Sequence, residues 1–207
     1  SDVCSSDLTT SLGNRYILVI ADYFTKWTQA FPMKDMLATT VSEIFIKNWV
    51  CIWGTPMYLH SDRGTNFTSH IFEKLCKDFG IQHTLTSGYR PQSNGLVERM
   101  MFNIAQMLNA IVDQETEWDI ALDFAMMAYR SSVHESTRET PYYVNTGREM
   151  RLPYDVMTDL NIEEKFNTAE YVVEMKPRLH NSFISVRNHL FQAAKRQKEY
   201  YDRKTHM

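Results

Sequence analysis

The segment 54–79 constrains the fold of this chain more than any other part of its sequence. A short apolar and β-prone run at 57–61 follows the breakers Gly-Thr-Pro and predicts a buried strand. Gly64 permits a tight turn, and Thr68 or Ser69 is suited to cap a helix. Apolar residues then recur at helical spacing: Ile71, Phe72, Leu75, Cys76 and Phe79. A strand, a sharp turn and a helix in this order predict an α/β domain.

Two acidic residues, Asp62 and Glu98, are the candidates for chemistry, and 35 residues separate them. Asp62 directly follows the predicted strand, and open α/β sheets bind ligands beyond the carboxyl ends of their strands. Strand-end aspartates also form turns and caps, so both interpretations stay open. Glu98 falls in the first turn of a predicted helix, after a loop rich in breakers. A glutamate there can also stabilise its own helix by ~0.3–1 kcal/mol, which is the structural alternative.

Several motifs occur in an order that resembles one known family. They are Gly-Asn-Arg-Tyr-Ile-Leu-Val at 13–19, Asp-Tyr-Phe-Thr-Lys-Trp at 22–27, Ser-Asp-Arg-Gly-Thr-Asn-Phe-Thr-Ser at 61–69 and Pro-Gln-Ser-Asn-Gly-Leu-Val-Glu-Arg at 91–99. Together they resemble the integrase catalytic core of gypsy-type LTR retrotransposons and retroviruses, over residues 9–157. The resemblance implies an α/β, RNase H-like fold, with a mixed five-stranded sheet, helices on both faces and a C-terminal helical extension at 158–207.

The resemblance also implies a reaction, DNA integration by two-metal phosphoryl transfer, with 3′-end processing and strand transfer. In that family three carboxylates hold the ions, and Asp62 and Glu98 match two of them, as catalytic residues and as metal ligands. Mg²⁺, or Mn²⁺ in its place, prefers such oxygen ligands, and two ions are expected with the substrate. The predicted DNA contacts are Asn66, Tyr89, Gln92 and Asn94, although polar loop residues also serve as solvated turn formers.

The first aspartate of the family motif has no clear counterpart here. Residues 1–8 do not resemble the family's first strand and are interpreted as a truncated or foreign leader. Asp2 is the stand-in candidate for the missing catalytic aspartate, whereas Asp22, on the second strand, is expected to be structural. Two functions therefore stay open: an active polynucleotidyl transferase, or an inactive integrase-derived fragment that binds only nucleic acid or a protein. A ribonuclease H fits less well, because the Pro-Gln-Ser-Asn-Gly loop and the 35-residue spacing are integrase features.

The charge of the chain is unevenly distributed. The formal net charge is −3, but residues 176–207 carry +6 and the remainder −9. This basic, helical tail predicts phosphate attraction, with a solvated basic helix as the alternative. The resemblance implies DNA and further copies of the chain as partners, and a nuclear location. No membrane and no small-molecule substrate are expected. No apolar run approaches the ~20 residues of a membrane span.

The remaining expectations concern individual elements. Strands are predicted near 16–21, 27–33, 57–61 and 81–86, and helices near 39–53 and 69–79 and from about 94, 117 and 169. The boundary between core and tail is predicted within 153–167. Met100 to Asn103 replace a run that contains arginine in relatives, so they either remove a DNA contact or extend the apolar core. Cys51 and Cys76 are expected inside helices as small apolar residues.

Overall fold

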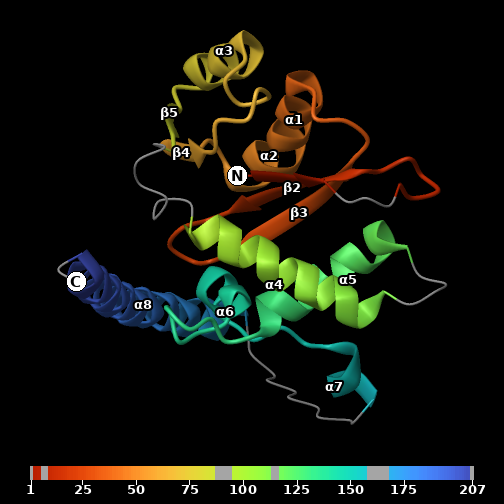
Figure 1. Cartoon of the computed structure of the whole chain (residues 1–207). Coiled ribbons are helices and arrows are strands. Elements are labelled where there is room, and N and C mark those ends of the chain that lie inside the picture. Colours follow the sequence, from red (N-terminus) through yellow and green to blue (C-terminus); the bar gives the residue numbers. More distant parts are fainter. Residues whose placement is uncertain (1, 6–8, 87–94, 113–116, 158–167, 206–207) are drawn as a thin grey trace. The chain divides into compact units, whose positions relative to one another are not determined.

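The structure is a computed structural model, and it describes residues 2–5, 9–86, 95–112, 117–157 and 168–205 (Figure 1). The chain divides into two compact units. The first contains residues 1–21 and 29–126, and the second contains 22–28 and 127–207. None of the helices in the described ranges is long and apolar enough to cross a membrane.

The first unit contains two small sheets. Strand β2 (Tyr16–Ala21) lies between β1 (Asp2–Ser5) and β3 (Thr28–Met33). β1 is antiparallel to β2, whereas β4 (Tyr58–Ser61) and β5 (Gln82–Leu85) form a separate parallel pair. The described residues therefore form a three-stranded and a two-stranded sheet, not the single five-stranded sheet expected from the sequence. The physical reason lies in the shortness of β1, whose four residues offer few ladder bonds to hold a further strand.

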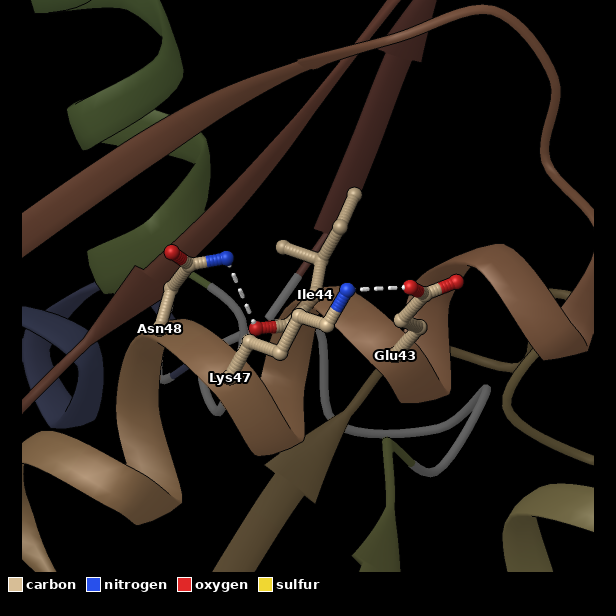
Figure 2. Close-up of polar contacts among 4 residues, drawn as sticks. All are labelled: Glu43, Ile44, Lys47 and Asn48. Carbon is tan, nitrogen blue, oxygen red and sulfur yellow. Dashed lines mark hydrogen bonds and ion pairs between the residues drawn. The ribbon is translucent and has the colours of Figure 1, made fainter.

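The helix expected near 39–53 is confirmed. α1 (Ala38–Phe45) continues through the π-helical turn η1 (Ile46–Val50) into α2 (Cys51–Trp53). Figure 2 shows two contacts along its surface: the Lys47 ammonium pairs with Glu43, and Asn48 Nδ2 donates to the Ile44 carbonyl at 3.2 Å. The helix ends at Gly54, whose φ of 85° lies in the region that favours glycine.

Cys51 lies in a helix, as expected, but it does not pack there as a small apolar residue. Phe45 and Trp49, four residues apart, define the buried side of this helix. Cys51 follows Trp49 by two residues, which rotates its side chain about 200° around the helix axis. Its thiol is exposed, whereas Cys76 is buried as expected.

Helix α3 (His70–Asp78) follows the Asp62 turn and begins at a cap that the sequence predicted. Ser69 Oγ accepts a hydrogen bond from the Phe72 backbone N–H at 3.3 Å. Phe72 is fully buried between the rings of Phe45 and Phe67, at centroid distances of 6.2 and 5.3 Å. The buried face is narrower than the periodicity indicated, since Ile71 and Phe79 are exposed.

Two longer helices complete the first unit. α4 (Gly95–Ile111) buries Met100, Ile104 and Leu108, whereas Phe102 is 61% exposed. Met100 thus extends the core, and Phe102 does not. α5 (Trp118–Ser131) begins in this unit, where its buried Asp119 accepts hydrogen bonds from Thr10 and Asn14, both at 2.8 Å. These bonds hold the N-terminal part of the hairpin against the start of the helix.

The second unit is helical. α6 (Pro141–Thr146) is followed by α7 (Pro153–Met157), which lies inside the predicted boundary region, and by α8 (Thr168–Thr205), which confirms the predicted tail helix. Gly147 ends α6 at a φ of 74°, and a Cβ there would clash with the Met175 and Leu179 side chains. α6 therefore packs closely against α8, and the predicted domain boundary after residue 157 stays a prediction.

Candidate functional site

Asp62 lies where the sequence predicted, directly after the carboxyl end of β4. In the parallel β4–β5 pair, Ser61 is opposite Leu85, and the Thr86 N–H donates to the Ser61 carbonyl at 2.9 Å. Arg63 Nε donates to the Thr86 carbonyl at 2.8 Å. The residues on both sides of Asp62 are thus hydrogen-bonded to Thr86, directly after β5, which fixes the position of this half-buried residue.

The turn after Asp62 closes tightly around oxygen atoms. The Gly64 N–H donates to Asp62 Oδ1 at 2.8 Å. A Cβ at Gly64 would lie 2.5 Å from Asn66 Oδ1 and 3.0 Å from Asp62 Oδ1, so only glycine leaves room for both. Among the described residues, no hydrogen bond reaches Asp62 Oδ2. The carboxylate therefore keeps capacity to accept from another group.

Asn66 is buried beside this carboxylate. Its exposed fraction is 6%, and its Nδ2 has no hydrogen-bond partner in the part of the chain that the structure describes. Its predicted contact with DNA stays a prediction. Its position instead indicates a role in shaping the Asp62 turn, because its side-chain oxygen shares the space above Gly64 with Asp62.

Two histidines behind Asp62 were not predicted as functional residues. His83 Nε2 lies 2.9 Å from Ser61 Oγ, and Ser61 Oγ donates to the Asp62 carbonyl at 2.9 Å. Because the Ser61 hydroxyl donates its single hydrogen to that carbonyl, it can only accept from His83. The contact between Ser61 and His83 therefore requires Nε2 to be the donor. His60 Nδ1 pairs with Thr84 Oγ1 at 3.0 Å. Burial lowers the pKa of both imidazoles, which favours their neutral forms.

A sequence signal for His83 exists only in retrospect. Successive side chains of its strand point to opposite faces of the sheet. The His83 ring lies on the same face as Phe72 and packs edge-on against that ring, at 5.4 Å between centroids. Pairing of β5 with β4 then brings His83 within reach of Ser61, a contact between residues that are distant in the sequence. Neither the type nor the spacing of these residues indicates that bond without the register of the sheet.

The other predicted site residues are only partly described. Glu98 lies in the first turn of α4, as predicted, but its side chain lies outside the described part of the structure. Asp2 lies in β1, opposite Val19, and its side chain is likewise outside it. Tyr89, Gln92 and Asn94 also lie outside the described residues. The convergence of Asp62 with Glu98 therefore stays a prediction.

Asp22 has the structural role that the sequence predicted. Its Oδ2 accepts hydrogen bonds from the Thr25 N–H at 2.6 Å and from the Thr25 hydroxyl at 2.7 Å. Lys26 follows in the same turn, and its ammonium lies 4.1 Å from the centroid of the Tyr23 ring. Burial lowers the pKa of Lys26 to about 8, an effect that the charge of Asp22 partly offsets.

The donor atoms around Asp62 suit a hard divalent cation. A half-buried carboxylate with an unused oxygen, next to an amide oxygen, offers the ligand type that Mg²⁺ prefers. Within the described ranges, no group of three or more His, Cys, Asp or Glu side chains is arranged to hold a metal ion. The assignment of Asp62 as a metal ligand therefore stays a prediction.

Comparisons with known proteins agree with these features. Residues 1–91 match the family model of the integrase core domain. The Pol polyprotein of transposon 412 from Drosophila melanogaster is 25% identical over 193 residues, which cover 93% of this chain and 16% of that protein. The Gag-Pol polyprotein of Koala retrovirus is 35% identical over 137 residues, which cover 65% of this chain and 8% of that protein. The chain thus spans less than a fifth of the length of these relatives.

Solved structures show the same fold. The catalytic core domain of BIV integrase is 27% identical, with a TM-score of 0.57 over 69% of this chain and 89% of that one. The HTLV-2 integrase catalytic core domain, solved in a trimeric form with magnesium, is 21% identical, with a TM-score of 0.56 over 68% of this chain and 90% of that one. The fold is therefore the RNase H-like fold of integrase catalytic cores, and residues 1–91 are similar to the integrase core domain found in retroviral and transposon Pol polyproteins.

Proposed function

We propose that this chain acts in DNA integration, as the phosphoryl-transfer core of a retroelement polyprotein. The observation that carries the proposal is Asp62, a half-buried carboxylate fixed at the end of β4 with one oxygen unused among the described residues. Its motif lies inside the segment that matches the integrase core model. A carboxylate at a rigid strand end is suited to hold a cation at a fixed place beside a phosphodiester.

Asp62 and Glu98 are the proposed metal ligands, with Asp2 as the stand-in for the third carboxylate. The chemistry that a pair of Mg²⁺ or Mn²⁺ ions supplies in such a site is activation of the attacking oxygen and stabilisation of the leaving oxygen. The chain's own part is to orient these oxygens. The Gly64 N–H fixes Asp62 Oδ1, and the bonds of Ser61 and Arg63 to Thr86 hold the backbone on both sides of Asp62.

The proposed substrate is DNA, with the ends of the element and a target duplex as its two forms. Asn66, Tyr89, Gln92 and Asn94 are the proposed contacts, and the basic tail adds attraction for phosphate. Assembly into oligomers is part of the proposal, supported by the trimeric form of the HTLV-2 neighbour. A nuclear location follows from the proposed reaction.

The second candidate is an inactive integrase-derived module that binds nucleic acid or a protein. The composition of β1 favours it, because Asp-Val-Cys-Ser does not resemble the strand that carries the family's first aspartate. The two functions differ in the role of Asp2. In an active enzyme this residue or its equivalent completes the ligand set.

The test combines metal binding with strand transfer. Mn²⁺ titration followed by electron paramagnetic resonance is expected to show binding to the wild-type chain and its loss in Asp62→Asn. Asp78→Asn, an exposed aspartate of α3, is the matched control and is expected to bind as wild type does. An Mn²⁺ titration of Asp62→Asn that equals that of the wild type would contradict the assignment of Asp62 as a metal ligand.

Strand transfer is then measured with an oligonucleotide end and a supercoiled plasmid in Mn²⁺. Product that disappears in Asp62→Asn, Glu98→Gln and Asp2→Asn supports the active enzyme. If Asp2→Asn is the only one of the three variants that still forms product, another group is the third ligand. Metal binding and DNA binding without any product in the wild type support the inactive module.

A further inference from the structure

The C-terminal helix α8 presents two different faces. One face packs within the second unit: Val186 and Ser182 are buried, and His189 Nδ1 lies 2.9 Å from the Thr137 carbonyl oxygen. The opposite face carries the exposed residues Val173, His180, Ile184 and Phe191. Their intervals of seven, four and seven residues place them along one line of a helix. We call this line the outer stripe.

The outer stripe is apolar where a solvated helix is normally polar. Val173 is 71% exposed, Ile184 47% and Phe191 73%. At the N-terminal end of the stripe, a shallow hollow is lined by Val173, Lys176, Pro177 and His180. Single exposed apolar residues are common on protein surfaces, but a line of them at helical spacing is the pattern that receives another helix.

Positive charge prevails along the outer stripe after its N-terminal end, where Glu170 and Glu174 flank Val173 in the sequence. Residues 175–198 contain no acidic residue and six basic ones: Lys176, Arg178, Arg187, Lys195, Arg196 and Lys198. Lys176 and Arg187 lie at the border of the stripe, about one helical turn away from His180 and Ile184 respectively. An apolar line bordered by positive charge complements a helix whose apolar line is bordered by carboxylates.

From this surface we infer that α8 is the docking site for an acidic amphipathic helix of a partner protein. From Val173 to Phe191 the stripe extends about 27 Å at 1.5 Å per residue, which matches a partner helix of about five turns. A second copy of α8 fits poorly, because it brings the same basic residues, Lys176, Arg178 and Arg187, to the stripe. Duplex DNA would satisfy the cations but would leave Ile184 and Phe191 without an apolar partner.

The experiment uses the full 207-residue chain and a synthetic helical peptide. The peptide has about three heptads, with leucine at the core positions and glutamate at the flanking ones, and carries a fluorophore for anisotropy. Binding is expected for the wild-type chain, and a loss of affinity of roughly tenfold or more for Phe191→Ser and for Ile184→Asp. Phe102→Ser, which removes an exposed phenylalanine from α4, is the matched control and is expected to bind as wild type does.

A charge exchange tests the border of the stripe. The double variant Lys176→Glu with Arg187→Glu is expected to lose the glutamate peptide and to gain binding of the same peptide with lysine in place of glutamate. A scrambled peptide of equal charge without the leucine line is expected to bind weakly. Circular dichroism of each variant checks that α8 remains helical.

Three results would overturn the inference. Equal binding of the scrambled peptide, unaffected by Phe191→Ser, would show that charge alone attracts the peptide. A dimer in sedimentation that Phe191→Ser dissociates would assign the stripe to a second copy. Weaker binding of a 20-base-pair duplex in Phe191→Ser and Ile184→Asp, without peptide binding, would assign it to nucleic acid.

Discussion

Asp62 and Asp22 occupy equivalent places in the chain, and their surroundings differ. Each directly follows a strand, β4 or β2, and each accepts a hydrogen bond from the turn that comes after it. Asp22 Oδ2 accepts twice from Thr25, within the same turn as the buried Lys26. Asp62 accepts once, from Gly64, and shares the space above Gly64 with the Asn66 amide oxygen. Each carboxylate keeps one oxygen without a hydrogen bond among the described residues, Oδ1 in Asp22 and Oδ2 in Asp62. A strand-end aspartate is thus the stronger ligand candidate where its turn places a second oxygen beside it and not a buried ammonium.

The largest effect is expected from Gly64→Ala. Its Cβ would lie 2.5 Å from Asn66 Oδ1 and 3.0 Å from Asp62 Oδ1, so the turn must open. Overpacking of this kind costs about 1–3 kcal/mol, and Mn²⁺ affinity is expected to fall by roughly 100-fold as the carboxylate moves. Denaturant unfolding and metal titration measure the two effects.

Gly80→Ala is the matched control for that substitution. Gly80 has a φ of 68°, with nothing within 4 Å of a Cβ, so alanine there strains the backbone only. It is expected to lower stability without changing Mn²⁺ affinity. Equal metal affinity in Gly64→Ala and Gly80→Ala would contradict the role of the Asp62 turn.

The second largest effect is expected in the Asp22 turn, where Lys26→Met should change the free energy of unfolding. Burial lowers the folded pKa of Lys26 from 10.5 to about 8, so the unfolded chain binds the proton more tightly between these pH values. Stability therefore rises with pH from 8 towards 10.5, and the penalty below pH 8 amounts to about 3 kcal/mol at most. Lys26→Met is expected to be more stable than wild type at pH 7.

The pH dependence of the difference in unfolding free energy between wild type and Lys26→Met isolates this titration. The comparison cancels Tyr129 and Cys76, whose pKa values burial raises to about 12 and about 11. The advantage of the variant should shrink as the pH rises above 8. An advantage that stays constant from pH 7 to 10 would show that Lys26 titrates normally.

A smaller effect is expected from Asp22→Asn. The amide can still accept from Thr25, but the loss of charge weakens both bonds and removes the favourable field at Lys26. The expected destabilisation is about 1–2 kcal/mol, with Mn²⁺ affinity unchanged. A loss of metal binding similar to that of Asp62→Asn would erase the distinction between the two aspartates.

The smallest effect is expected from His83→Gln. Glutamine can donate to Ser61 Oγ in place of Nε2, so the change at pH 7.5 should be within about 1 kcal/mol. Because the folded pKa of His83 lies below 6.5, the unfolded chain takes up a proton first, and wild-type stability falls as the pH drops below 6.5. His83→Gln should lose less stability between pH 7.5 and 5.5, and His60→Gln, which has the same pKa direction, tests additivity.

The sequence predicted the local elements well. The strand before Asp62, the Ser69 cap, the helix that ends at Gly54 and the helical tail all depend on residues close together in the chain. The misses involve packing. Cys51 is exposed because it lies on the side of its helix opposite Trp49. The described strands form two sheets and not the single five-stranded sheet that the resemblance implies. Such outcomes depend on contacts between distant segments, which local periodicity does not contain.

The order of motifs, the position of Asp62 after a strand and the basic character of the tail were determined by the sequence alone, because each follows from neighbouring residues. Tertiary structure decided what those residues do. It placed Asn66 and Asp62 around the space that Gly64 leaves, brought His83 to Ser61 through the register of β4 and β5, and left the apolar line of α8 exposed. Hydrogen bonding and burial act through space, so the unused oxygen of a carboxylate emerges only when its surroundings are assembled.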